Sequence, residues 1–323
     1  MKSGELRLKK CSAAIISLLL FISCATVPRT GPPPEDGSPD FSVLPPGAQF
    51  YLWADINSAR PILEALPLFE MGGMDTSDNR AASQILDRTD TVLAAVYPED
   101  AGKRFFVAGW GNYPNVRAGV SMSFSRGWRR VRSQTGSRYW YSRDQNIGVA
   151  LGSSLAFVSD GDPFTPAAGS CPAPRDFPEF HRDMVLAGWA ADSAGSINRS
   201  LDVLGIPIQI PAEDLIFGVA RIPHVPAPAA VYPEIWEFVM RFRFQSPFHA
   251  RSLLALFTQV RNFTQRAAAG SQFSGDFLSP QEFAALLFAN QPQLDNDSVI
   301  LRTDPLTANR IALLSYLFTV LSN

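Results

Sequence analysis

Cysteine and histidine are scarce in this chain, and their scarcity limits the chemistry it can perform. The 323 residues include three cysteines and three histidines. The histidines are His181, His224 and His249, and no two of them are spaced to share one face of a helix or strand. Metal sites usually combine such residues, so neither a metal site nor a cofactor is expected. Each histidine is interpreted as a surface residue rather than as a lone general base.

Motifs of several enzyme classes are also missing. The sequence has no Gly-x-Ser-x-Gly elbow, no phosphate-binding Gly-Lys-Ser/Thr loop and no dinucleotide glycine fingerprint. Residues 295–297 (Asp-Asn-Asp) begin like a calcium loop, but the glycine is absent and Leu306 stands where a bidentate glutamate is needed. A binding protein is therefore favoured over an enzyme.

Charge gives no support for nucleic-acid binding. The formal net charge is −2, and residues 1–23 carry four basic residues and one acidic residue, so a chain without them has a net charge of −5. A mildly acidic chain has no bulk attraction for nucleic acid. Beyond residue 24 the positive charge is almost entirely arginine, with Lys103 the only lysine.

Positive charge opens the chain and a short apolar run follows it. The basic residues are Lys2, Arg7, Lys9 and Lys10, and the apolar run is 12–22. About 11 residues are too few to cross a bilayer, which takes roughly 20 in a helix. We therefore expect residues 1–23 to be an export signal that is removed.

The end of this signal, Phe21-Ile22-Ser23-Cys24-Ala25, resembles the lipobox of bacterial lipoproteins. In that family a small residue precedes a cysteine that is acylated and becomes the mature N-terminus. The resemblance implies lipidation of Cys24 and attachment to a membrane of the bacterial cell envelope, on its periplasmic face or at the cell surface. Phe21 stands where the family prefers leucine, as in the looser signals of spirochaete-like bacteria. The alternative is an ordinary secretory signal, with Cys24 free to pair with Cys171.

A proline-rich segment follows Cys24. Residues 24–47 contain Pro28, Pro32, Pro33, Pro34, Pro39, Pro45 and Pro46. Such density prevents regular secondary structure and favours extended polyproline geometry. We interpret residues 24–47 as a tether between the membrane and the folded body; a ligand for an aromatic groove is the alternative.

Beyond the tether, short apolar strands alternate with helical stretches, which indicates an α+β fold. Two modules are expected, at 48–162 and 184–323, joined by a proline-rich linker at 163–183. In each, the predicted order is strand-helix-strand-strand-helix-strand, the split βαβ order of ferredoxin-like folds with antiparallel sheets. Trp53-Ala54-Asp55 is echoed by Trp189-Ala190-Ala191-Asp192, which suggests internal duplication.

Apolar periodicity and turn residues predict the individual elements. The predicted strands are 50–54, 91–97, 104–109, 128–132, 138–142, 147–151, 155–159, 184–189, 215–220, 235–244 and 298–302. Predicted helices include 114–125, 247–262, 280–289 and 306–321. The apolar end of the last helix is expected in the core, with partner binding as the alternative.

One region is strongly basic and aromatic. Residues 101–143 contain no acidic residue, and the candidate binding residues within them are Arg129, Arg130, Arg132, Arg138, Trp128 and Trp140. Guanidinium groups beside aromatic rings can hold an acidic protein, an acidic glycan or an anionic lipid headgroup. In a hairpin that turns near Thr135-Gly136, Arg130 and Arg132 share one face and Tyr139 and Tyr141 the other. The alternative is a strand surface whose rings fill the core.

A pair of carboxylates offers a second hypothesis. Asp55 and Asp192 end the first strands of the two expected modules, where they could face a shared cleft. Capping of the following helices is the simpler interpretation of both. Taken together, the sequence predicts a membrane-anchored lipoprotein that acts as a binding or scaffold protein, with an envelope hydrolase or a surface adhesin as alternatives.

Overall fold

The structure is a computed structural model that describes part of the chain. The described residues are 39–65, 87–97, 105–125, 127–144, 146–164, 173–191, 194–195, 198, 209–222, 235–268, 280–312 and 314. The predictions for Cys24, Cys171, Asp192 and His224, and most of the tether, lie outside these residues. The chain divides into two compact units, Met1–Arg60 with Leu68–Ala173 (unit 1) and Pro61–Pro67 with Pro174–Asn323 (unit 2).

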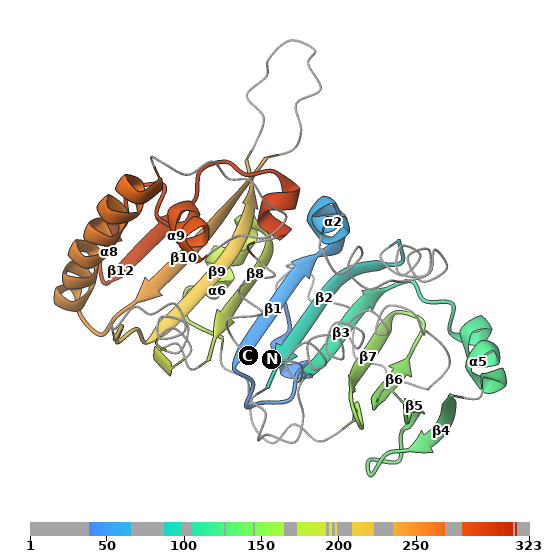
Figure 1. Cartoon of the computed structure of the whole chain (residues 1–323). Coiled ribbons are helices and arrows are strands. Elements are labelled where there is room, and N and C mark those ends of the chain that lie inside the picture. Colours follow the sequence, from blue (N-terminus) through green and yellow to red (C-terminus); the bar gives the residue numbers. More distant parts are fainter. Residues whose placement is uncertain are drawn as a thin grey trace, which may run out of the picture. The chain divides into compact units, whose positions relative to one another are not determined.

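Unit 1 is built on an antiparallel sheet in the order β1-β2-β3-β7-β6-β5-β4 (Figure 1). Its strands are β1 (Phe50–Asp55), β2 (Thr89–Val96), β3 (Phe105–Gly111), β4 (Trp128–Arg132), β5 (Arg138–Ser142), β6 (Ile147–Leu151) and β7 (Leu155–Asp160). The helical elements are η1 (Phe41–Val43) and α5 (Asn115–Phe124), together with the first residues of α2 (Ile56–Glu64), whose residues from Pro61 onward belong to unit 2. Strand β4 stands last in the order, so it forms one edge of this sheet.

Both faces of this sheet carry apolar side chains. On one face Met122 of α5 packs in a cluster with Trp128, Trp140 and Val149. Elsewhere in the unit Phe157 lies 5.6 Å from Phe106 between ring centroids, and further aromatic contacts link it to the loop after β7. Strand β6 is buried along its whole length, as expected of an inner strand covered on both sides.

The strands of unit 2 pair antiparallel, in the order β11-β12-β10-β9-β8. The strands are β8 (Met184–Ala190), β9 (Asp214–Arg221), β10 (Trp236–Arg243), β11 (Gln293–Asp295) and β12 (Ser298–Arg302). The helical elements are α6 (Phe177–Phe180), η3 (His181–Asp183), α8 (Pro247–Ala268) and α9 (Pro280–Leu287).

Helix α8 is amphipathic and packs on strand β10. Ala250, Leu253 and Phe257 are buried at helical spacing. The ring of Phe257 meets that of Phe242 edge-on, with centroids 5.3 Å apart. This contact fixes one face of β10 as the core face, so alternate residues of β10 point the other way.

The predicted α+β class with antiparallel sheets is confirmed. The predicted strands and the helices expected at 114–125 and 280–289 are present with ends shifted by at most two residues, whereas α8 runs to Ala268, six residues past its predicted end. Strand β11 was not predicted, nor was η1 within the expected tether, nor were α6 and η3 within the expected linker. Ferredoxin-like modules are not confirmed. The strands of a βαβ unit run parallel, whereas β1 and β2, which flank α2, pair directly and antiparallel.

The two units do share a strand order. In unit 1, β1, β2 and β3 pair in succession, and after α5 the last strand β7 returns beside β3. In unit 2, β8, β9 and β10 pair in succession, and after α8 and α9 the last strand β12 returns beside β10. Each unit is therefore a three-stranded meander extended by a returning strand. In the part of the chain that is described, no helix is long and apolar enough to cross a membrane.

Candidate functional site

The predicted basic and aromatic residues lie on one hairpin, formed by β4 and β5 and called here the arginine hairpin (residues 128–142). Its register pairs Arg129 with Tyr141, Arg130 with Trp140 and Arg132 with Arg138. The turn comes at Gly136, whose φ of +88° is one that residues with a side chain rarely adopt. The predicted turn at Thr135-Gly136 is thereby confirmed.

The turn is held to the rest of unit 1 by polar contacts. Ser133 donates its backbone N–H to the carbonyl of Ser137 (2.8 Å). The hydroxyl of Ser133 donates to Asp162 in the loop after β7, at 2.6 Å. The arginine hairpin is therefore fixed at both ends, by the sheet and by this loop.

The aromatic rings of the hairpin belong to the core. Trp128 and Trp140 are 9% and 5% exposed and pack with Met122 of α5. On the opposite face Tyr139 is 7% exposed and its ring contacts that of Phe164, with centroids 6.4 Å apart. The alternative interpretation of these rings, as core residues, is the one the structure supports.

The arginines, in contrast, are exposed. Arg129, Arg130, Arg132 and Arg138 all point to solvent. The guanidinium carbon of Arg129 lies 5.2 Å from the ring centre of Tyr141, a cation–π contact. Arg132 donates from Nε to the carbonyl of Gly136 at 3.2 Å. Within the described residues, none of these four arginines forms an ion pair with a carboxylate.

Neighbouring charges also affect the pKa of the buried Tyr139. Burial raises the pKa of this phenol above its ordinary value, and the carboxylate of Asp162 raises it further. Arg129 acts in the opposite direction, because its positive charge favours the ionised phenol. The face of the hairpin that holds Arg129 thus combines a cation with aromatic rings.

A second charged cluster, in unit 2, was not predicted. Arg241 forms ion pairs with Asp176 (3.4 Å) and Asp295 (3.1 Å). Arg243 pairs with Asp214, and Arg302 with Glu237 at 2.8 Å. The sequence did contain one sign of this cluster. Glu237, Arg241 and Arg243 are spaced by even numbers of residues on an otherwise apolar strand, which places their side chains on the same face.

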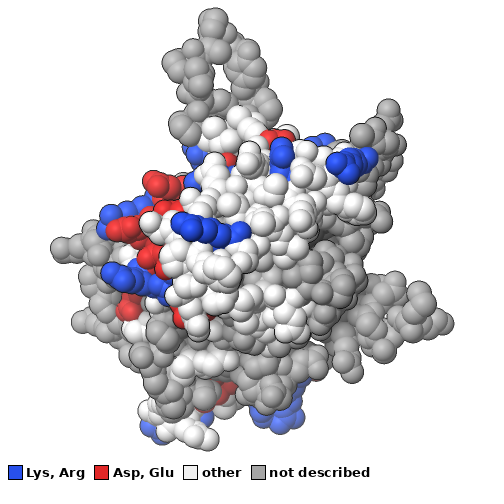
Figure 2. Space-filling model, turned by 90° about the vertical axis from the view of Figure 1, so that its left-hand side faces the viewer, with Lys and Arg blue, Asp and Glu red and all other residues white. Residues whose placement is uncertain are grey.

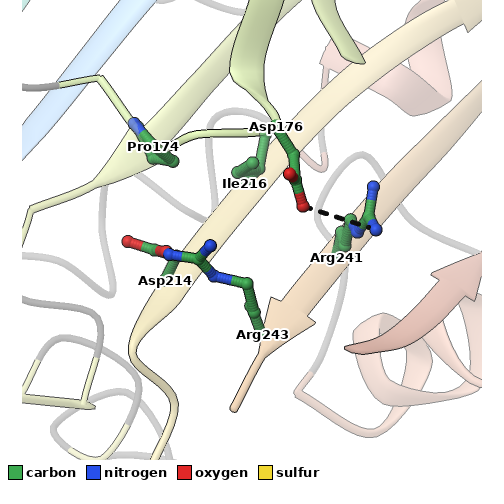
Figure 3. A pocket seen from close by; sticks show the side chains of 6 residues that line it. All are labelled: Pro174, Asp176, Asp214, Ile216, Arg241 and Arg243. Carbon is green, nitrogen blue, oxygen red and sulfur yellow. Dashed lines mark hydrogen bonds and ion pairs between the residues drawn. The ribbon is translucent and has the colours of Figure 1, made fainter. Parts of the chain in front are cut away.

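Four side chains of this cluster, those of Asp176, Asp214, Arg241 and Arg243, line a small hollow between β9, β10 and the segment before α6 (Figure 3). Its lining residues are Pro174, Asp176, Asp214, Ile216, Arg241 and Arg243. The hollow leaves no room for a water molecule. Each guanidinium already faces a carboxylate, so the cluster is suited to holding strands and loop together rather than to binding a charged ligand. In the side view of Figure 2, the acidic side chains at the left of the view lie beside basic ones.

Asp55 caps a helix, as its simpler interpretation predicted. One of its carboxylate oxygens, Oδ1, accepts the backbone N–H groups of Asn57 (3.1 Å) and Ser58 (3.3 Å), and Oδ2 accepts the hydroxyl of Ser58 (2.8 Å). These bonds satisfy free N–H groups at the start of α2.

The histidines divide between core and surface. The surface interpretation of His181 is wrong: it is 5% exposed and stacks on Phe177 with centroids 5.7 Å apart. The packing of α6 and η3 onto β8, which sequence reasoning missed, encloses it. His249 is exposed and bonds the hydroxyl of Ser246 (3.0 Å). No group of three or more metal-binding side chains occurs among the residues described.

The fold has counterparts among solved structures. No family model and no curated protein matches the chain. Three crystal forms of TP0453, a Treponema protein, share its fold. Form III has a TM-score of 0.54 and 16% identity over 87% of this chain and 99% of that one. Forms I and IV each have a TM-score of 0.51, with 15% and 16% identity over 87% and 88% of this chain and 98% of theirs.

Proposed function

We propose that this protein is a lipid-anchored lipoprotein of the bacterial cell envelope that acts as a binding or scaffold protein. Cys24 carries the lipid, and the arginine hairpin binds an anionic partner. The tether is the part of residues 24–47 that precedes residue 39, because Phe41 and Leu44 are buried (6% and 1% exposed) and the hydroxyl of Tyr97 donates to the carbonyl of Pro45. The shared fold with a Treponema protein agrees with the resemblance of the signal to the looser spirochaete-like lipobox.

The observation that carries the binding role is the contrast between two sets of arginines. In unit 2, Arg241, Arg243 and Arg302 each face a carboxylate. On the arginine hairpin, Arg130, Arg132 and Arg138 are exposed without such a partner in the described chain. An anion supplied from outside can satisfy several of these guanidinium groups at once.

Protection of a sheet edge is the competing explanation. Charged residues on an edge strand discourage pairing with other chains, and β4 is an edge strand. Under this explanation the hairpin would repel strands and bind no anion, so a binding measurement separates the two.

The anchor is tested by following incorporation of labelled fatty acid in a bacterial host. The Cys24→Ala variant should lose the label, and Cys171→Ala, which leaves the signal intact, should keep it. Label retained by Cys24→Ala would overturn the lipoprotein assignment.

The binding surface is tested with the triple variant Arg130→Ser, Arg132→Ser, Arg138→Ser and two probes, polyglutamate and vesicles containing phosphatidylglycerol. A control triple variant, Arg182→Ser, Arg251→Ser, Arg266→Ser, removes the same charge from exposed sites elsewhere. Loss of binding in the first variant and retention in the control is the expected result. Equal binding by both variants would favour edge protection.

The alternative functions, an envelope hydrolase and a surface adhesin, have less support. A carboxylate hydrolase lacks a supporting observation, because both carboxylate oxygens of Asp55 accept hydrogen bonds from its own turn. A surface adhesin and a periplasmic scaffold differ in location, and protease accessibility on intact cells distinguishes them.

Internal duplication is part of the same proposal. The matching strand order of units 1 and 2 supports descent from one repeated module, now without a ferredoxin-like topology. Superposition of β1–β3 on β8–β10 with Trp53 on Trp189 is the outcome that this origin requires.

A further inference from the structure

Strand β4 has one free edge. It pairs with β5 and stands at the end of the strand order of unit 1, and in the described part of the chain no strand pairs with its other side. An unpaired edge presents backbone N–H and C=O groups that can accept another strand.

The register decides which backbone groups face outward. Ser133 and Ser137, the pair next to Arg132 and Arg138, are hydrogen-bonded to each other. Hydrogen-bonded and non-hydrogen-bonded pairs alternate along an antiparallel ladder. The backbone groups of Arg130 and Arg132 therefore point away from β5. Trp128 follows the same alternation, and its N–H donates outside the ladder, to the carbonyl of Ser125 (3.3 Å).

The side chains along this edge select what can pair there. Arg130 and Arg132 are exposed on one face, Arg129 on the other, and Arg138 adds a fourth positive charge from β5. A second copy of β4 would place arginine against arginine, which is unfavourable for directly opposed residues. A strand with acidic side chains would instead place a carboxylate beside each guanidinium.

We propose that β4 accepts an acidic, extended segment of a partner protein, which adds to the sheet as an antiparallel strand. This inference rests on the proposed anion-binding role of the arginine hairpin and names its partner. The segment carries Asp or Glu at alternate positions, opposite Arg130 and Arg132, so that backbone bonds and ion pairs form together. Its intervening side chains lie on the face of Val131 and Tyr141.

The first experiment uses an acetylated, amidated eight-residue peptide of alternating Glu and Val. A glutamate opposite Arg130 shares its face and directs its own N–H toward β4, because that pair is hydrogen-bonded. Methylation of the glutamate nitrogens therefore blocks pairing, whereas methylation of the valine nitrogens leaves it intact. We expect the peptide methylated at its glutamate nitrogens to bind at least about tenfold more weakly than the peptide methylated at its valine nitrogens, since more than one backbone hydrogen bond is lost. Equal affinities would overturn strand addition.

The second experiment changes the protein. Arg130→Gln removes the charge and keeps the outward N–H, whereas Arg130→Pro removes both and leaves the bonds to β5 in place, as proline on an edge strand can. The proline variant should bind the peptide more weakly than the glutamine variant, with circular dichroism confirming that both fold. In the native protein, the peptide should slow hydrogen exchange at the amides of Arg130 and Arg132. Unchanged exchange at both amides would contradict the proposal even if the proline variant failed to fold.

These outcomes separate this inference from the function on which it rests. If both methylated peptides bind equally and the triple arginine variant binds neither, anion binding stands and strand addition fails. If the native protein binds neither the peptide nor polyglutamate nor vesicles, the proposed binding role itself is wrong. If vesicles bind and the peptide does not, the anionic partner is a lipid surface, and strand addition is overturned.

Discussion

Arg132 and Arg138 lie directly opposite each other across the arginine hairpin, in a non-hydrogen-bonded pair whose side chains share one face. Such pairs bring the Cα atoms to about 4.5 Å, closer than hydrogen-bonded pairs. Like charges on directly opposed residues of neighbouring strands are destabilising. The hairpin therefore carries a local electrostatic cost that a bound carboxylate would relieve.

Replacing one of these arginines with an acid should stabilise the free protein. Arg132→Glu converts a like-charge pair into an ion pair, so the free energy of unfolding should rise by roughly 0.2–1 kcal/mol. Urea denaturation measures the change. The same variant should bind polyglutamate more weakly, because it has lost a positive charge. The substitution should therefore raise stability and lower binding affinity. The double variant Arg132→Glu, Arg138→Glu restores a like-charge pair and should lose the gain; a gain that persists there would show that repulsion is not its cause.

Removing the helix cap at Asp55 should destabilise the protein. Asp55→Ala deletes an acceptor for two backbone N–H groups of α2, which typically costs about 1 kcal/mol, in a range of roughly 0.5–2. Asp55→Asn keeps a capping oxygen and should cost much less. Urea denaturation of the two variants checks this difference, and equal losses would mean that the charge of Asp55, rather than capping, matters.

The phenol of Tyr113 should make stability depend on alkaline pH. Its hydroxyl lies 3.1 Å from that of Thr89 in the interior, and burial raises its pKa from 10.0 to about 12. The hydrogen bond with Thr89 lowers the pKa, and the negative charge of Asp90 raises it. The folded state disfavours the ionised phenol, so this contribution is complete below pH 10, where both states are protonated. It is lost as pH rises from about 10 to about 12, by up to roughly 2–3 kcal/mol.

Tyr113→Phe should lack this alkaline decline. At pH 8 the variant should be less stable by about 0.5–1.5 kcal/mol, because the bond to Thr89 is lost. Unfolding free energies measured at several values of pH between 8 and 12 check both statements. A difference between native protein and variant that does not shrink as pH rises would contradict the raised pKa of Tyr113.

A side chain at Gly148 should be poorly tolerated. A Cβ atom there would lie 1.8 Å from the carbonyl oxygen of Gly161, which is backbone and must shift. Gly148→Ala should therefore destabilise by about 1–3 kcal/mol. Gly127 is the matched control, because its nearest neighbour to a Cβ is a side-chain oxygen of Asp144 at 3.8 Å. Thermal unfolding of both alanine variants tests the comparison, and similar losses would remove the steric explanation.

Local elements of unit 1 could be predicted well because their signals are local. Strands 128–132, 138–142 and 147–151 have the predicted ends, since apolar alternation and turn residues such as Gly136 act within a few residues. Strand β11 could not be predicted, because Gln293–Asp295 is short and largely exposed and forms a strand only by pairing with β12.

The candidate site was predictable in part. Its arginines and the face of each residue follow from the period-two geometry of strands. The burial of Trp128 and Trp140 depends on Met122, which arrives from α5. The ion pairs of Arg241 join residues up to 65 positions away from it in the sequence, Asp176 being the more distant of its two partners. No local pattern could indicate such pairs.

The sequence alone therefore determined the elements whose signals lie within a few residues: the strands, the hairpin turn at Gly136, the cap at Asp55 and the resemblance of the Cys24 segment to a lipobox. Only the tertiary structure decided the order of the strands, the burial of His181, Trp128 and Trp140, and the position of β4 at an edge. The reason is that hydrogen-bond ladders and core contacts join residues far apart in the chain, and several strand orders satisfy the same local preferences.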